Sequence, residues 1–220
     1  MLENAAASRA ETRRRLLEAA GAEFAEHGYR AATVKRIAER AGVTVQTLYL
    51  AWTSKATLLR AHLESSLAGE PDADYAAAIA HAIDVAVRAT DGDAHRIVVE
   101  CAHLFRLSAE RAAPAWKLYR DAAATDPAIA DDWHNLQQLR HQSFERLIGQ
   151  LPPAALRAGM SPGAAVETAW VIASPETYEL YVENRGHALD DYEAWLTATL
   201  AAALLDDPPM TPHRPRSVDH

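Results

Sequence analysis

Side chains that can bond to nucleic acid occur together in a short polar segment, residues 45–49. Gln46 can form two hydrogen bonds with an adenine edge, and Val45 can press on a thymine methyl group. Thr47 can bond a base or a phosphate, and Tyr49 is placed to contact the phosphate backbone. Side chains of these types on one helix would suit contacts in the major groove of DNA.

Three further residues complete the predicted DNA-contacting set: Thr33, Thr44 and Lys55. Lys55 is expected in the first turn of a helix, where the positive end of the helix dipole assists phosphate binding. A purely structural role is the less favoured alternative, because Gln46 and Lys55 have no evident packing use in the sequence.

The segment around these residues predicts two short helices and the start of a third. Thr33, Thr44 and Ser54 are N-cap residues whose hydroxyls can accept hydrogen bonds from the first turn of a helix. Gly42 stands where the first helix must end in a left-handed residue. Leu48 is expected to face inward. This pattern predicts a helix-turn-helix, whose second helix would enter the major groove.

The sequences GYRAATV, IAERAGVTVQTLY and SKATLL resemble the N-terminal domain of the tetracycline-repressor (TetR) family of transcriptional regulators. The resemblance covers about the first sixty residues. It implies the same DNA-contacting roles, a cavity in the second domain, and dimerisation through the last helices. One departure is Ala51-Trp52, where many members have His-Phe; Trp52 can replace the buried aromatic, but Ala51 loses a side chain that could contact the DNA backbone.

The charge distribution supports a nucleic-acid partner, although the 220-residue chain has a formal net charge of −8. Residues 1–60 hold ten Lys/Arg against six Asp/Glu, whereas the remaining residues hold twelve against twenty-four. A basic end joined to an acidic body fits a protein that presents one surface to phosphate.

Cysteine content and hydropathy predict a soluble cytoplasmic protein. Cys101 is the only cysteine, so no intrachain disulfide can form and a reducing compartment is expected. The N-terminal residues lack the apolar core of a signal peptide. No run of about eighteen apolar residues is present to span a bilayer, so no membrane partner is expected.

Hydrophobic periodicity predicts an all-α protein with no strands. A helix-turn-helix domain is expected over residues 8–60, a helical ligand-binding and dimerisation domain over 61–205, and a disordered tail over 206–220. Besides the helices of the helix-turn-helix and the one that begins after Ser54, helices are predicted over 8–27, 75–90, 93–112, a short segment opened by Pro114, 127–151, 162–173, 175–183 and 190–205. The helix over 127–151 is expected to be the longest.

The first predicted helix carries a basic run, Arg13 to Arg15, on its exposed side, and we expect Gly28 to end it in a left-handed conformation with Tyr29 packing behind. A solvated face and a phosphate-contacting face are equally open for the three arginines.

Aromatic and polarisable residues on core-facing helices of the second domain suggest a small-molecule site, because such sites are mostly apolar with a few convergent polar groups. Filling of the helical bundle is the alternative for each of them. The predicted ligand-binding residues are His103, Trp116, Tyr119, Trp133, His134, Phe144 and Trp170.

No metal site and no cofactor are expected. Glu100 and His103 form an E-x-x-H, the local motif of carboxylate-bridged metal sites, but no second copy occurs. His134 and His141, seven residues apart, fit a surface or pocket-rim pair better. Signature motifs of hydrolases, zinc proteases and phosphate-binding loops do not occur.

The C-terminal helices are apolar across broad arcs, which predicts pairing with the same helices of a second subunit into a four-helix bundle. The predicted dimerisation residues are Ala165, Ala169, Ile172, Trp195, Leu196 and Leu200.

Together these features predict a dimeric, ligand-responsive transcriptional repressor that binds a palindromic double-stranded operator and is released by a small-molecule effector. Two rivals remain open. One is a helical enzyme that uses Glu100, Cys101 and His103, although they lack a partner constellation. The other is a small-molecule carrier with a vestigial DNA-binding head.

Overall fold

The structure, a computed structural model, describes residues 2–69 and 74–206, and over these residues it is helical without a β-strand, as the sequence predicts. The predicted tail lies outside the described residues except for Asp206. The elements are α1 Leu2–Ala31, α2 Val34–Ala41, α3 Val45–Ala51, α4 Lys55–Ala68, α5 Tyr75–Arg88, α6 Ala94–Ala123, α7 Pro127–Ile148, the 3-10 turn η1 Pro153–Ala155, α8 Pro162–Ile172, α9 Pro175–Tyr178, the π-helix η2 Glu179–Asn184 and α10 Leu189–Leu204.

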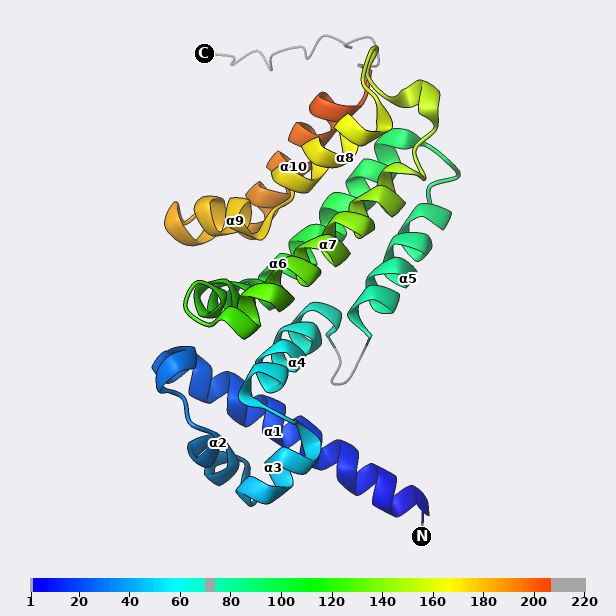
Figure 1. Ribbon diagram of the computed structural model, residues 1–220. Coiled ribbons are helices and arrows are strands. Elements are labelled where there is room, and N and C mark those ends of the chain that lie inside the picture. The colour runs from blue at the N-terminus through cyan, green and yellow to red at the C-terminus, as the bar shows by residue number, and fades with distance from the viewer. Residues whose placement is uncertain (1, 70–73, 207–220) are drawn as a thin grey trace, which may run out of the picture.

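The helices form an elongated molecule with α1, α2 and α3 at one end (Figure 1). We call these three helices the head and α5 to α10 the body. Helix α4 leads from the head into the body, where α5, α6 and α7 lie together. Helices α8 and α10 pack side by side at the far end. The candidate DNA-contacting residues therefore lie at the opposite end from the predicted dimerisation helices.

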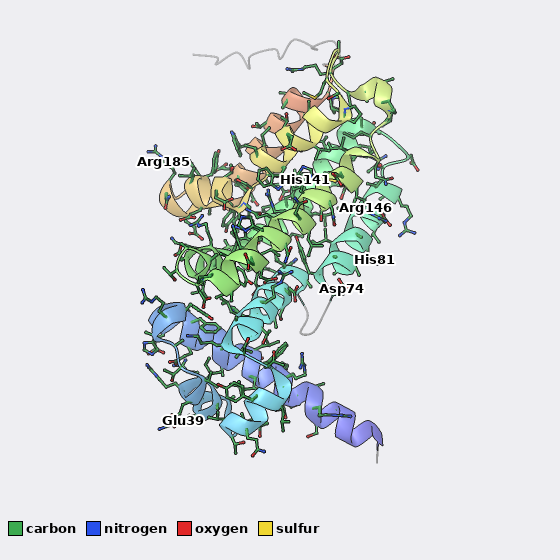
Figure 2. All side chains as sticks on the ribbon, in the orientation of Figure 1. Glu39, Asp74, His81, His141, Arg146 and Arg185 are labelled. Atoms are coloured by element: carbon green, nitrogen blue, oxygen red, sulfur yellow. The ribbon has the colours of Figure 1, made fainter. Side chains whose placement is uncertain are left out.

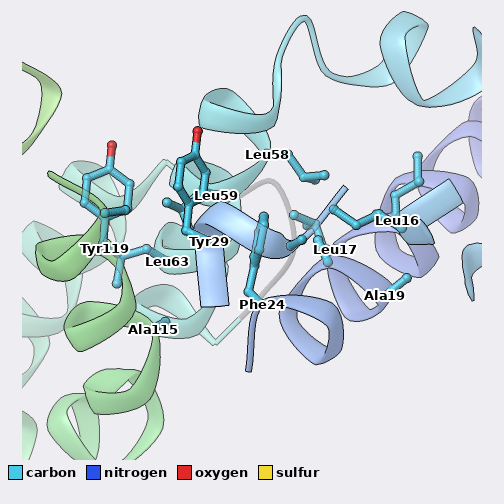
Figure 3. Close-up of a cluster of buried hydrophobic side chains, with 14 of the residues drawn as sticks. Leu16, Leu17, Ala19, Phe24, Tyr29, Leu58, Leu59, Leu63, Ala115 and Tyr119 are labelled. Atoms are coloured by element: carbon cyan, nitrogen blue, oxygen red, sulfur yellow. The ribbon is translucent and has the colours of Figure 1, made fainter. Parts of the chain in front are cut away.

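Two clusters of buried side chains hold the helices together. The first joins the head and α4 to α6 and α7, and the second joins α5, α6 and α7 to α8 and α10. Figure 3 shows that α1, α4 and α6 meet in the first cluster through Leu16, Leu17, Phe24, Leu59, Leu63, Ala115 and Tyr119. Because this cluster crosses residue 60, the predicted domain boundary does not coincide with a gap in the packing.

Helix α6 differs from the sequence prediction, because it continues through Pro114 instead of giving way to a new short helix. Proline cannot donate the helical hydrogen bond, and an interior proline costs about 3 kcal/mol. Ala113, Ala115 and Trp116 beside it are buried in the two clusters, and this burial offsets the lost bond. At 30 residues each, α1 and α6 are longer than α7, which spans 22, so the prediction that α7 is the longest helix was wrong.

The end of α1 agrees with its glycine signal. Gly28 has φ +73°, a conformation that strains residues with a Cβ atom, and Tyr29 after it is buried. The helix resumes for three residues beyond this kink before α2 begins.

Surface ion pairs also connect the body helices. Arg146 of α7 pairs with Asp84 of α5 at 2.6 Å, and Figure 2 shows Arg146 and His81 on these neighbouring helices. Arg120 of α6 similarly contacts Glu179 of η2 at 3.0 Å. Within residues 2–69 and 74–206, no helix combines the length and apolar character that crossing a bilayer requires.

Candidate nucleic-acid interface and internal cavity

Local hydrogen bonds define the ends of α2 and α3, as the sequence predicts. Thr33 Oγ1 accepts a hydrogen bond from the Arg36 amide at 3.3 Å, and Thr44 Oγ1 accepts one from the Thr47 amide at 3.1 Å. Gly42 is left-handed, with φ +67° and ψ +36°. The caps and the turn fix the direction in which α3 leaves α2.

Helix α3 buries one side and exposes the other. Leu48 is fully buried, whereas Gln46 is exposed and Tyr49 is 51% exposed. Val45 is 37% exposed, so the predicted outward face is present. Leu50 is the most exposed large apolar side chain of α3, at 82%. Leu50 is not among the residues predicted to contact DNA, although its place two residues after inward Leu48 indicates an outward direction.

Lys55 has a structural role in addition to the phosphate contact predicted for it. Its ammonium donates hydrogen bonds to the carbonyl oxygens of Tyr29 at 2.7 Å and Ala32 at 3.0 Å, and lies 4.1 Å from the Tyr29 ring centroid. Burial lowers the pKa of Lys55, against the opposing effect of Asp126. Because an ammonium has three N–H donors, these bonds leave one for a phosphate.

The arginine run of α1 has divided roles. Arg13 donates a hydrogen bond to the Ala51 carbonyl at 2.7 Å and lies 3.7 Å from the Trp52 ring centroid. Arg15 donates to the Ala41 carbonyl, and Arg14 pairs with glutamates of its own helix. Arg13 and Arg15 therefore hold α3 and α2 against α1, a structural role that neither sequence alternative anticipated.

A buried carboxylate connects α1 to α2. Glu23 is 1% exposed, and its oxygens lie 2.9 Å from Arg36 and 3.5 Å from Arg40. With Glu26 and His27 it forms a group whose ligand atoms are close enough for a metal ion, but the two guanidinium groups already lie against it. The positive charge of α2 is thus partly neutralised on its α1 side.

A cavity of about 130 Å³ lies among α4, α5, α6 and α7. Its walls are mainly apolar, and two predicted ligand-binding residues, Trp116 and Phe144, contribute to them. The ring of Phe144 stacks on Phe105, with centroids 4.8 Å apart. Leu67 of α4 and Pro175 of α9 also line the cavity. The prediction of a mostly apolar cavity in the body is therefore consistent with this geometry.

The other five predicted ligand-binding residues do not line this cavity: His103, Tyr119, Trp133, His134 and Trp170. His103 Nδ1 lies 3.0 Å from Glu193 of α10. His134 is exposed, and its ring lies 2.7 Å from the Ala130 carbonyl of its own helix. The sequence placed His103 and His134 on helices of the body, but helical spacing did not determine which face of its helix each would occupy.

The three aromatic residues among those five have packing roles. Trp133 lies against Trp116 and Tyr119, with centroid separations of 4.9 and 6.1 Å. The Tyr119 hydroxyl donates a hydrogen bond to Asp132. Burial and, to a smaller extent, this hydrogen bond raise the pKa of Tyr119. Trp170 lies beneath the guanidinium of Arg140 at 5.0 Å.

Arg140 lines the cavity but is not among the ligand-binding residues predicted from the sequence. It is 7% exposed, and its Nη2 donates to the carbonyl oxygens of Trp170 at 2.6 Å and Ala173 at 3.1 Å. Burial lowers its pKa to about 10, so the side chain is still charged at neutral pH. Its position between inward Leu136 and Phe144 at four-residue spacing was the available sequence signal.

Most of the predicted dimerisation residues are part of the subunit core, so they are not accessible to a second subunit as predicted. Ala165, Ala169, Leu196 and Leu200 are each at most 2% exposed and pack in the second cluster. The remaining two, Ile172 and Trp195, are half-buried against it. The open faces of α8 and α10 instead carry Val171, which is 59% exposed, with Ala164, Ala194 and Ala198.

Comparisons with known proteins agree with the fold and the head geometry. The family model "Bacterial regulatory proteins, tetR family" matches residues 16–62. No match is found among curated protein sequences. Among solved structures, SmeT in complex with triclosan has 20% identity and a TM-score of 0.69, over 95% of this chain and 99% of SmeT.

Two further structures show the same similarity. SmeT, the repressor of the Stenotrophomonas maltophilia multidrug efflux pump SmeDEF, has 20% identity and a TM-score of 0.62, with 93% of this chain and 96% of that chain covered. A transcriptional regulator from Rhodococcus sp. Rha1 has 15% identity and a TM-score of 0.62, with 89% and 98% covered. Residues 16–62 thus match the TetR-family model, and the chain as a whole shares the fold of solved transcriptional regulators of that family.

Proposed function

We propose that the chain is a cytoplasmic, homodimeric transcriptional repressor that binds a palindromic operator and is released by a small molecule in the body. The observation that carries this proposal is the exposed face of α3. Gln46 and Tyr49 face outward while Leu48 anchors the same helix in the core. A short helix presented in this way, within a helix-turn-helix, suits insertion into the major groove.

The exposed residues of the head would make two kinds of DNA contact. Gln46, Val45 and Thr47 would contact base edges, and Tyr49, Thr33 and Thr44 the flanking phosphates. The remaining N–H of Lys55, the first residue of α4, would contribute one phosphate contact in addition to its two bonds to the carbonyls of Tyr29 and Ala32. Two heads fit a palindrome when their α3 helices lie about 34–36 Å apart, one turn of DNA.

Helix α4 physically connects the cavity to the head. At one end Lys55 bonds the carbonyls of Tyr29 and Ala32, at the C-terminal end of α1, and at the other end Leu67 lines the cavity. Midway, Arg60 contacts Asp132 of α7 at 3.1 Å. A helix of 14 residues spans about 21 Å, so a small tilt at the cavity end would move the head relative to the body.

The exposed faces of α8 and α10, at the end of the molecule away from the head, are suited to form the dimer interface. Val171 leaves a large apolar side chain exposed, and the alanines of α10 allow close approach of another helix. SmeT, which has this fold, is the repressor of a multidrug efflux pump and was solved with triclosan bound. These similarities support a repressor with a small-molecule effector.

The enzyme alternative is less well supported by the geometry around Cys101. Burial raises the pKa of this thiol to about 12, so it stays protonated and is a poor nucleophile. Glu100 is exposed, and His103 faces Glu193 on the other side of α6 from the cavity. A carrier with a vestigial head would have no use for the exposed polar side of α3.

The direct test is binding to the DNA upstream of the gene for this chain, measured by fluorescence anisotropy at about 0.15 M salt. We expect affinity at least about 10³-fold above that for a scrambled fragment. Compounds that raise the melting temperature of the protein would then be added. A true effector should lower the affinity for operator about five- to 150-fold, and operator should lower the affinity for the effector by the same factor. Equal affinity for scrambled DNA would reject the proposal.

A further inference from the structure

The charged side chains that line the cavity are all of one sign. Among the residues that line it, Arg111 and Arg140 are charged and there is no aspartate or glutamate. Arg111 is at the exposed side and donates to the Leu67 carbonyl at 3.2 Å, while Arg140 is buried. The rest of the lining is aromatic, aliphatic or hydroxyl-bearing. The cavity is therefore an apolar space with a positive end.

The buried charge of Arg140 is only partly compensated. The two carbonyls that Nη2 contacts belong to the C-terminal end of α8, which offers about half a negative charge. The Phe144 and Trp170 rings, 5.1 and 5.0 Å from the guanidinium carbon, add cation–π attraction. The charge of Glu176 raises the pKa of Arg140 against the larger effect of burial, but among the described residues no carboxylate forms an ion pair with this guanidinium.

A buried charge that is not paired with a counter-ion is costly, and a bound anion reduces that cost. A guanidinium has five N–H donors in a planar fork that matches a carboxylate. Since Nη2 is taken by the α8 carbonyls, Nε and Nη1 remain to bind it. The hydrogen bonds to the α8 carbonyls give Arg140 a structural role. They do not explain why the cavity lining also contains Arg111 but no aspartate or glutamate.

We propose, on the basis of the proposed effector-binding role of this cavity, that its ligand is a small organic carboxylate whose anionic group binds Arg140. Its apolar part fills the space between Phe105, Phe144 and Trp116. A cavity of about 130 Å³ is close to the roughly 150 Å³ site that accepts benzene in another protein. The apolar part is therefore about one aromatic ring or a short alkyl chain.

The test compares three probes that share one body: phenylacetate, 2-phenylethanol and 2-phenylethylammonium, each titrated into the full-length protein by calorimetry. Phenylacetate should bind at least tenfold more tightly than the alcohol, and the ammonium weakest. Acetate, which has the charge without the ring, should not bind. Equal or tighter binding of the alcohol or the ammonium, or no binding of phenylacetate, would overturn the proposal.

Variants locate the anion. Arg140→Leu should remove the preference for phenylacetate over the alcohol, and Arg140→Lys should retain part of it. Arg146→Gln removes a charge from the same helix away from the cavity and should leave the preference unchanged. If Arg140→Leu unfolds, the wild-type comparison of the three probes and the Lys variant still decide the question. An unchanged preference in a folded Arg140→Leu protein would contradict the site.

Operator binding separates this proposal from the repressor function. If phenylacetate binds through Arg140 but leaves operator affinity unchanged, the anion site stands and control of DNA binding by this cavity fails. If a neutral compound binds the cavity and releases operator while phenylacetate does not bind, the repressor function stands and the carboxylate proposal fails.

Discussion

At the scale of single residues, the exposed face of α3 combines a base-contacting group with an anchoring one. Gln46 extends into solvent two residues before Leu48, which is fully buried. Side chains that project this far without an internal partner contribute little to folding, so their loss should affect DNA binding alone.

Gln46→Ala should weaken operator binding by about 1–3 kcal/mol and relax the preference for one base pair in each half-site. The melting temperature should stay unchanged, because the side chain is exposed. Competition binding with single-base operator variants measures both effects. Gln138→Ala, an exposed glutamine on α7, is the matched control and should leave DNA binding intact. A preference that survives Gln46→Ala would show that this residue does not contact a base.

Lys55→Met should lower both stability and DNA affinity, because its ammonium donates to two carbonyls of the head. Loss of these bonds should reduce the free energy of unfolding by about 1–3 kcal/mol. DNA affinity should fall equally for operator and scrambled sequences, with a smaller salt dependence. Urea unfolding and salt titrations measure the two effects.

Lys35→Met provides the comparison, since Lys35 is exposed on α2 and pairs only weakly with Glu39, at 3.9 Å. We expect less than about 0.5 kcal/mol of destabilisation there. A Lys55→Met protein as stable as Lys35→Met would mean that the two carbonyl bonds add nothing to folding.

At the scale of elements, the head is assembled by long side chains of α1 that contact the ends of the shorter helices. α2 and α3 have eight and seven residues, too few to be stable alone. Arg13 holds the end of α3, and Arg15 holds the end of α2. Gly42 belongs to this arrangement, because a Cβ atom there would lie 2.7 Å from the Arg15 guanidinium.

Arg13→Ala should therefore destabilise the head by about 1–3 kcal/mol, through loss of the Ala51 hydrogen bond and the stacking on Trp52. The change in unfolding free energy can be measured by denaturant titration with Trp fluorescence. Arg14→Ala, which removes the neighbouring arginine with exposed glutamate partners, should destabilise the protein clearly less than Arg13→Ala. Similar losses in the two variants would argue against a structural role for Arg13.

At the scale of the whole molecule, the burial pattern separates folding from assembly on α8 and α10. Ala169 and Leu200 are inside the subunit, so charged substitutions there would unfold the body before they could report on dimerisation. Val171 is exposed on the neighbouring side of α8 and is the better probe.

Val171→Asp should convert a wild-type dimer into a folded monomer with weak operator binding, because one half-site offers too few contacts. Sedimentation velocity at micromolar concentration and circular dichroism measure assembly and folding. Val85→Asp, at a similarly exposed valine on α5, should remain dimeric. A monomeric wild-type protein, or a dimeric Val171→Asp variant, would reject the proposed interface.

The sequence by itself determined the features that depend on a few neighbouring residues. The hydroxyl caps at Thr33, Thr44 and Ser54, the left-handed Gly42 and the inward Leu48 were all predictable, because each depends on hydrogen bonds or periodicity within one helical turn. The all-α class follows from the same local signals repeated along the chain.

Only the tertiary structure decided which contacts form between distant segments. Lys55 meets carbonyls more than twenty residues earlier, and Arg140 meets carbonyls thirty residues later. The apolar arc of α10 looks the same in the sequence whether it faces its own subunit or another. Periodicity gives the side of a helix that avoids water, but the neighbour that covers it is set by packing of the whole chain.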